Sequence, residues 1–167
     1  MTKAELQNLV IDYADAYSID RSIALAQIQR ESGFNPLAIG SSGERGLGQF
    51  MPGTWARFGQ GDFSNAFNPD YNLTAWGNYM QWLLNRYSWD YSKALQGYNG
   101  GERNVDRGTV SSSARNYAAS ILAQAGQSSV LSPVADSPSD SSSTIFGLPI
   151  VLALAIGGGL LYLALKD

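Results

Sequence analysis

The most informative stretch of this chain is ESGFNPLAIGSSGERGLGQFMPGTW, which covers residues 31–55. It opens on one ionisable group, Glu31, and continues through several glycines, which let a ligand approach the backbone closely. Gln49, Met51 and Trp55 then supply an amide, a thioether and an indole. These groups together suit a sugar ligand.

Glu31 lies at the end of a predicted helix. Asp20 is placed to cap the free amides at the start of that helix, and Gly33 suits a left-handed stop. Ala24, Ile28 and Glu31 fall at i, i+4 and i+7, so the carboxyl shares a stripe with apolar residues that should face inward. Burial and the negative end of the helix dipole both raise the pKa of a carboxyl, as a general acid near neutral pH requires. The helix pattern alone favours the alternative, a glutamate in water.

The motifs around Glu31 resemble the catalytic domain of the soluble lytic transglycosylases, glycoside hydrolase family 23, which is related to goose-type lysozyme. The resemblance runs in the family's order and covers about residues 5–125. Its segments are residues 31–36, 43–55, 68–80, 94–101 and 115–122. The resemblance therefore implies a mainly α, lysozyme-like domain.

The resemblance also implies roles for particular residues. Glu31 becomes the catalytic acid, Gln49 binds an N-acetylhexosamine near the cleavage point, and Met51 lines the neighbouring subsite. Tyr98 points its hydroxyl toward the catalytic carboxylate, and Asn99 helps to shape the cleft. Without the resemblance, Gln49 is a loop amide, Met51 fills the core, and the end of the 94–101 segment is a helix stop and turn.

The chain departs from the family at a few positions. The serine that usually lies three residues before Gly43 is Gly40 here, with Ser41 next to it, so the sugar-binding role of that serine is either lost or moved to Ser41. Ser113 replaces a common acidic residue, and Gly48 replaces a bulky apolar one. These changes affect substrate affinity more than the acid itself.

Helical spacing places another set of large side chains in the core of the domain. Trp55 is also assigned to the core, although an indole could serve as a sugar platform. The helical set comprises Trp76, Tyr79, Met80, Leu83 and Leu84.

Composition excludes several other chemistries. The 167 residues include no cysteine and no histidine, which rules out disulfides, thiol catalysis and a histidine-assisted serine nucleophile. We expect no metal and no cofactor. The net charge is −3 and no basic run is present, so nucleic acid is not an expected partner. The expected partner is the glycan strand of peptidoglycan.

The chain changes character after residue 126. We expect a lysozyme-like domain over 1–126, a Ser- and Pro-rich flexible linker over 127–144, and one transmembrane helix over 145–165. A buried core helix is the alternative for the last segment. Lys166 follows the apolar stretch, which favours a cytoplasmic tail and an outward-facing enzyme domain.

The start of the chain reads as a helix and not as a signal peptide, since Thr2 and Glu5 form a capping box. A peptidoglycan-cutting domain with a C-terminal anchor resembles the membrane-associated virion transglycosylases of membrane-containing phages. We therefore expect a single-pass protein of a virion membrane, with virion membrane or capsid proteins as further partners. A bacterial inner-membrane enzyme facing the periplasm fits the same pattern.

The resemblance implies a reaction between N-acetylmuramic acid and N-acetylglucosamine. Glu31 protonates the glycosidic oxygen, the substrate's own acetamido group or hydroxyl replaces a second carboxylate, and a 1,6-anhydro ring closes. Two alternatives stay open. A goose-type-like hydrolase would activate water with a carboxylate such as Asp62 or Asp70, and a non-catalytic membrane-anchored virion protein would only bind glycan or hold other proteins.

Overall fold

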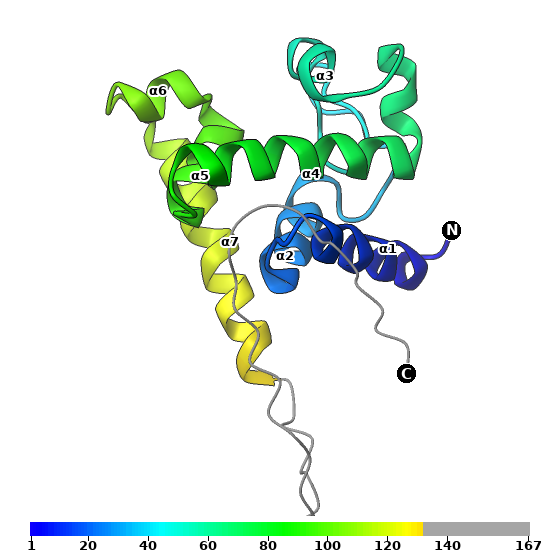
Figure 1. The fold of residues 1–167 in the computed structure, drawn as a ribbon. Coiled ribbons are helices and arrows are strands. Elements are labelled where there is room, and N and C mark those ends of the chain that lie inside the picture. Colours follow the sequence, from blue (N-terminus) through cyan, green and yellow to red (C-terminus); the bar gives the residue numbers. More distant parts are fainter. Residues whose placement is uncertain (132–167) are drawn as a thin grey trace, which may run out of the picture. The chain divides into compact units, whose positions relative to one another are not determined.

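Helix α4, Pro69–Arg86, crosses the middle of the fold, with α1 and α2 on one side of it and α3 on the other (Figure 1). The computed structural model describes residues 1–131. Helix α7 packs against both α2 and α5, so it joins the N-terminal helices to the later ones. The expected mainly α fold is confirmed. The elements in chain order are α1 (Lys3–Ala16), α2 (Arg21–Ser32), α3 (Pro52–Phe58), the 3-10 helix η1 (Phe63–Phe67), α4, α5 (Tyr91–Gly100), α6 (Glu102–Asp106) and α7 (Ser112–Leu131).

The first two helices begin and end as the sequence predicts. The Thr2 hydroxyl accepts from the Glu5 amide at 3.3 Å, and the Glu5 carboxylate accepts from the Thr2 amide at 2.7 Å, which completes the capping box. Asp20 accepts from the Ile23 amide at 3.0 Å and so caps α2. Gly33 ends α2 with a left-handed φ of 61°, which sets the chain on its path toward the loop that follows.

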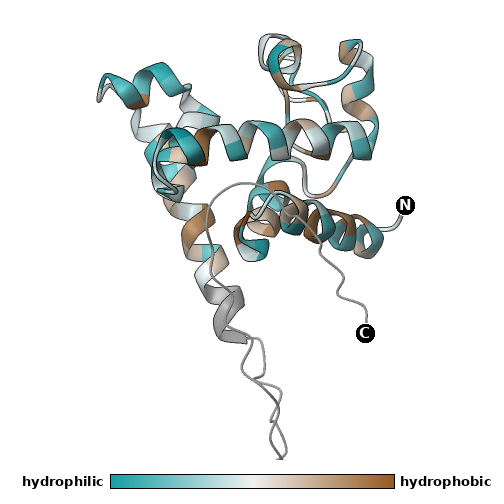
Figure 2. Ribbon diagram, in the orientation of Figure 1, coloured by the Kyte–Doolittle hydropathy of each residue, from teal (hydrophilic) through white to brown (hydrophobic). Residues whose placement is uncertain are grey.

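The core lies where the apolar faces of these helices meet. Hydrophobic and hydrophilic residues alternate along α1 and α4 in Figure 2, as amphipathic helices require. The residues predicted for the core of α4 are all buried, and Trp55 of α3 is 2% exposed, so its assignment to the core is also confirmed. The fully buried large side chains include Trp76, Ile28, Leu47, Leu73, Met80, Leu83, Leu84, Leu95 and Ile121.

Helix α7 continues past Gly126, where we expected the linker to begin, and ends at Leu131. Residues 127–131 contain no proline or glycine to stop the helix, and the first proline after it is Pro133. The rest of the predicted linker, 132–144, and the predicted transmembrane segment, 145–165, lie outside the described residues. Among residues 1–131, no helix combines the length and the apolar character that crossing a bilayer needs.

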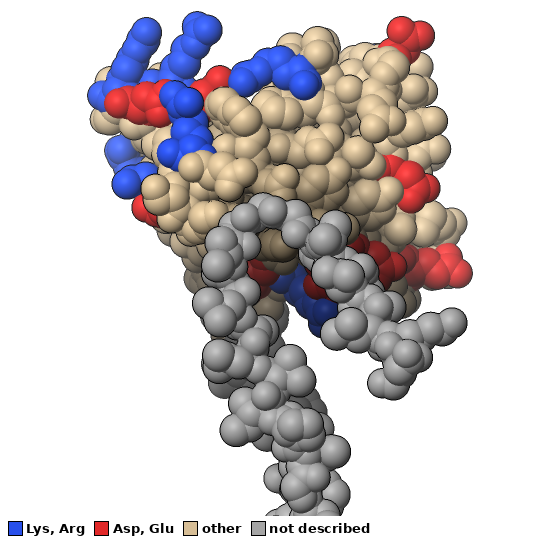
Figure 3. All heavy atoms as spheres, viewed as in Figure 1, with Lys and Arg blue, Asp and Glu red and all other residues tan. Residues whose placement is uncertain are grey.

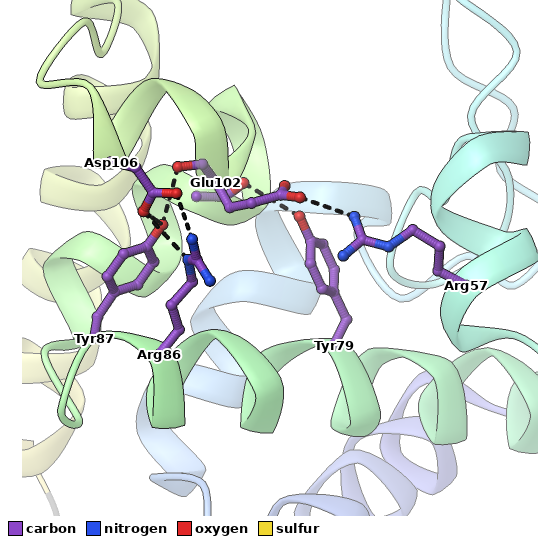
Figure 4. A network of polar contacts seen from close by, with 7 residues as sticks. Arg57, Tyr79, Arg86, Tyr87, Glu102 and Asp106 are labelled. Carbon is purple, nitrogen blue, oxygen red and sulfur yellow. Dashed lines mark hydrogen bonds and ion pairs between the residues drawn. The ribbon is translucent and has the colours of Figure 1, made fainter.

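Ion pairs fasten the short helix α6 to its neighbours (Figure 4). Arg57 of α3 donates to Glu102 at 2.9 Å, and Arg86 of α4 donates to Asp106 at 2.5 Å. The Tyr87 hydroxyl adds a bond to the Glu102 carbonyl at 3.1 Å. Figure 3 shows one face of the molecule, where basic (blue) and acidic (red) side chains mix at the α6 end. Much of the remaining surface of this face is uncharged.

The loop between α2 and α3 is held against α4 by one buried amide. Asn72 is 0% exposed and accepts from the Gly48 amide at 2.8 Å, while its own NH₂ group donates to the Ala66 carbonyl at 2.7 Å. Gly46 lies inside this contact with a left-handed φ of 76°. A methyl group there would lie 1.9 Å from the Ala66 carbonyl oxygen, so only glycine fits.

We therefore predict that Gly46→Ala lowers the free energy of unfolding by roughly 2–4 kcal/mol, because it combines left-handed strain with a clash against the backbone. Denaturant titration measures the change. Gly53→Ala in α3 is the matched control, since no atom lies within 4 Å of its new methyl group. Equal stability of the two variants would contradict this account of the loop.

Candidate active site

A cavity of about 290 Å³ opens between the end of α2, the loop before α3, and α5. It brings together all six residues that the sequence analysis selected, although they come from distant parts of the chain. The lining residues are Glu31, Gly40, Ser41, Glu44, Gln49, Phe50, Met51, Thr54, Tyr79, Tyr98 and Asn99.

Glu31 occupies the last turn of α2, beside the fully buried Ile28 of the same helix. Burial raises the pKa of this carboxyl from 4.5 to about 7. A hydrogen bond from the Tyr117 hydroxyl and the positive charge of Arg30 lower the pKa, while the nearby Glu44 raises it, and burial outweighs these effects. At neutral pH a large fraction of this carboxyl therefore carries its proton, as a general acid must.

The tyrosine that donates a hydrogen bond to Glu31 is not Tyr98. The hydroxyl of Tyr98 donates to the Gly48 carbonyl at 2.7 Å, and its orientation toward the Glu31 carboxyl stays a prediction. Tyr117, on α7, donates to Glu31 Oε1 instead. Tyr98 lines the cavity, and its ring packs edge-to-face against Phe50, with ring centroids 6.2 Å apart.

Gln49 is held in an unusual backbone conformation at the cavity wall. Its φ is 50°, and turn bonds between Arg45 and Phe50, each 3.0 Å, hold the loop in place on either side. Its NH₂ group donates to the carbonyls of Gly46 at 2.9 Å and Ala38 at 3.3 Å. The backbone thus occupies the donors of this amide, and its oxygen is the atom left to meet a ligand.

At Gly40, where the chain departs from the family pattern, two polar side chains approach the backbone closely. A methyl group there would lie 2.3 Å from Glu44 Oε2 and 2.8 Å from Gln49 Oε1. These two side chains fill the space that a larger residue would need. Ser41 lines the cavity beside them, and Met51, 42% exposed, lies at its open rim.

Residues 8–121 match the model of the transglycosylase SLT domain family. The chain belongs to this family. Among its curated relatives are membrane-bound lytic murein transglycosylases C. The one from Photorhabdus laumondii subsp. laumondii is 36% identical over 121 residues, which cover 64% of this chain and 33% of the relative. The one from Yersinia enterocolitica is 34% identical over 129 residues, which cover 68% and 36%. The chain thus spans about a third of the length of these relatives.

Solved structures share the fold of this SLT domain. The 70 kDa soluble lytic transglycosylase from Escherichia coli superposes with a TM-score of 0.62 at 24% identity, over 71% of this chain and 23% of that one. The lytic transglycosylase Slt from Pseudomonas aeruginosa, solved as an inactive glutamate-to-glutamine mutant, gives 0.63 at 21% identity, over 72% and 24%. At these identities the likeness establishes the fold.

Sequence reasoning missed two groups in the SLT domain that surround Glu31. Tyr117 was noted only as part of the last helix, and its contact with Glu31 crosses 86 residues of sequence. Glu44 is a second carboxyl in the cavity lining. Its position between Gly43 and Gly46, within residues 31–55, is the sequence feature that could have identified it as a site residue. Asp62 and Asp70, the carboxylates considered for a hydrolase, are not among the lining residues.

The part of the chain that the structure describes contains no set of side chains suited to hold a metal ion. Within residues 1–131, no three side chains of the metal-binding types His, Cys, Asp and Glu come together.

Glu31→Gln should change the pH dependence of stability. The pKa of Glu31 in the folded state lies above its unfolded value of 4.5, so wild-type stability falls as the pH rises from about 4.5 through about 7. Glutamine mimics the protonated acid and escapes this loss. At pH 8 the variant should be more stable than wild type by about 3 kcal/mol, and near pH 4 the difference should disappear. Urea denaturation at the two pH values measures it, and a pH-independent difference would contradict the raised pKa.

Proposed function

We propose that this chain is a peptidoglycan lytic transglycosylase that cuts the β-1,4 bond between N-acetylmuramic acid and N-acetylglucosamine. The observation that carries the proposal is the carboxyl of Glu31, which lines a sugar-sized cavity with a pKa of about 7. Family membership and the names of the relatives support the same reaction.

In the first step, Glu31 gives its proton to the glycosidic oxygen, and the bond from that oxygen to the anomeric carbon of N-acetylmuramic acid breaks. Positive charge develops at the anomeric carbon through an oxocarbenium-like state. The acetamido group of the same sugar stabilises this carbon. Gln49, Met51, Asn99 and Ser41 hold the sugars on either side of the break.

In the second step, the ionised Glu31 removes the proton from the C6 hydroxyl, whose oxygen attacks the anomeric carbon. A 1,6-anhydro ring closes, Glu31 recovers its proton, and no water is consumed. A group that first donates and then accepts a proton works best when its pKa lies near the working pH. The structurally similar Slt from Pseudomonas aeruginosa was solved as an inactive glutamate-to-glutamine mutant, which supports an essential glutamate in this reaction.

Glu31→Gln should therefore lower the release of soluble muropeptides from purified cell walls by at least about 100-fold, since it removes the transferable proton and keeps the shape. Asp62→Asn is a control, because Asp62 is an acidic residue outside the cavity lining. Mass spectrometry of the wild-type products should find anhydro-muropeptides, lighter by one water than hydrolysis products. Equal release by wild type and Glu31→Gln would instead indicate a non-catalytic glycan-binding or structural protein.

A second candidate, a goose-type-like hydrolase, is favoured by one observation. The carboxylate of Glu44 lines the same cavity as Glu31 and could activate a water molecule. Glu44 is held at the loop, where its Oε2 accepts from the Ser42 amide at 2.9 Å. If Glu44→Gln abolishes activity and the wild-type products carry only reducing ends, the hydrolase replaces the transglycosylase.

We further propose that the catalytic domain, which extends to the end of α7 at Leu131, is tied to a lipid bilayer through 145–165 by the segment 132–144. The apolar composition of 145–165 and the membrane-bound relatives support this arrangement. A virion membrane of a phage, with local cell-wall penetration during entry, suits a short tether. A bacterial inner membrane facing the periplasm is the alternative.

Flotation with phosphatidylglycerol-containing liposomes tests the anchor. The 167-residue chain should float with the vesicles. Leu154→Asp combined with Leu160→Asp should keep it in the dense fractions, because each buried charge costs about 2.5–3.5 kcal/mol at the bilayer centre. Flotation of both proteins would contradict an anchor in this segment.

A further inference from the structure

A line of hydrogen bonds leads from the core of the domain to Glu31. The indole Nε1–H of Trp76 donates to Gln27 Oε1 at 3.0 Å. Gln27 Nε2 donates to the Tyr117 hydroxyl at 3.2 Å, and that hydroxyl donates to Glu31 Oε1. The line thus connects α4, α2 and α7, and it ends on the carboxyl that the mechanism uses.

The two members of this line that lie farthest from Glu31, Trp76 and Gln27, are fully buried. Gln27 and Trp76 are each 0% exposed, and every buried side-chain nitrogen or oxygen among the described residues has a partner. A buried amide in an otherwise apolar core costs free energy unless it is fully paired. Helix periodicity would place an apolar residue at position 27, between Ala24 and Ile28, so packing alone does not explain Gln27.

The direction of every bond in the line follows from its first member. An indole N–H can only donate, so the Gln27 atom that faces Trp76 must be the amide oxygen. The NH₂ group of Gln27 must then face Tyr117 and donate to its oxygen. The hydroxyl proton of Tyr117 is left with one acceptor, Glu31 Oε1. A reversed amide would set two donors against each other at Trp76.

We propose that Gln27 and Trp76 are positioning residues that lock Tyr117 as a hydrogen-bond donor to Glu31 Oε1. The lock directs the transferable proton of the acid to Oε2. It deepens the proposed function and rests on Glu31 being the acid. Gln27 and Trp76 touch neither substrate nor cavity, since neither lines it.

The hydrogen bond from Tyr117 also lowers the pKa of Glu31. Burial raises the pKa of Tyr117 well above 10, so its hydroxyl keeps its proton at any working pH. Its hydrogen bond favours the ionised form of Glu31 and lowers that pKa against the effect of burial. The other charged or titratable groups that act on Glu31 are Arg30 on α2, Glu44 on the loop and Tyr98 on α5. None of these belongs to the hydrogen-bonded line.

The test is a ¹³C NMR titration of the Glu31 side-chain carboxyl in the 167-residue chain, which requires no enzymatic activity. Trp76→Phe removes the indole donor and lets the Gln27 amide turn, so Tyr117 can donate to Gln27 and leave Glu31. The Glu31 pKa should then rise by roughly one unit, the size expected for the loss of one hydrogen bond to a charged group. Tyr117→Phe removes the donor outright and sets the upper limit of the rise.

Two further variants complete the design. Gln27→Met keeps the volume of the side chain and removes the N–H that polarises the Tyr117 hydroxyl, so the Glu31 pKa should rise by less than it does in Trp76→Phe. Its measurement decides the question if Trp76→Phe does not fold. Trp55→Phe is the matched control, because this buried indole donates to the Gly61 carbonyl at 3.2 Å, outside the line. It should lower the melting temperature and leave the Glu31 titration unchanged.

The proposal is overturned if Trp76→Phe and Gln27→Met titrate as wild type does while Tyr117→Phe rises. Gln27 and Trp76 would then serve packing alone. The pH profile of muropeptide release is the second readout, and its alkaline limb should move upward with the Glu31 pKa. If Glu31→Gln retains full lytic activity while the titrations shift as expected, the proposed function fails and the lock stands.

Discussion

The chemistry of the cavity depends on the burial of one carboxyl, Glu31, at the junction of α2 and α7. Gly33 ends α2 directly after Glu31 and Ser32, so the Glu31 carboxyl lines the cavity from the last turn of this helix. The inner face of α2 is buried. Helix α7 returns from the far end of the chain to bring the Tyr117 hydroxyl onto Glu31 Oε1. Burial raises the pKa of Glu31 to about 7, and this contact, together with the positive charge of Arg30, keeps it from rising further.

The opposite wall of the cavity depends on a second buried amide. Asn72 fixes the loop through Gly48, and the Gly48 carbonyl in turn accepts from the Tyr98 hydroxyl at 2.7 Å. The same loop carries Gln49 in its left-handed conformation. Two buried polar side chains, Gln27 and Asn72, therefore organise the two sides of the site. Buried polar groups that are fully paired make such an arrangement specific, because any shift leaves a donor or acceptor unmet.

Much of this could be predicted from the sequence, because the signals are local. The capping residues Thr2 and Asp20, the stop at Gly33 and the helical spacing around Trp76 all act within a few residues. The position of Glu31 at a helix end followed from the same rules.

The remaining features depend on contacts between distant parts of the chain. Tyr98 and Tyr117 both carry a hydroxyl near the cavity, and only the packing of α5 and α7 decides which of them reaches Glu31. Gln27 looked like an ordinary helix residue, since its partners lie 49 and 90 residues away. The extent of α7 beyond Gly126 depended on helix propagation into a Ser-rich stretch, where composition favoured a linker.

Protonation of the glycosidic oxygen by Glu31 in this cavity can be tested with a crystal structure of the Glu31→Gln variant bound to a peptidoglycan tetrasaccharide. We expect the sugar to span the cavity with the scissile oxygen about 3 Å from the side-chain amide at position 31. A tetrasaccharide bound elsewhere, or one whose glycosidic oxygens all lie beyond hydrogen-bonding reach of that amide, would contradict it.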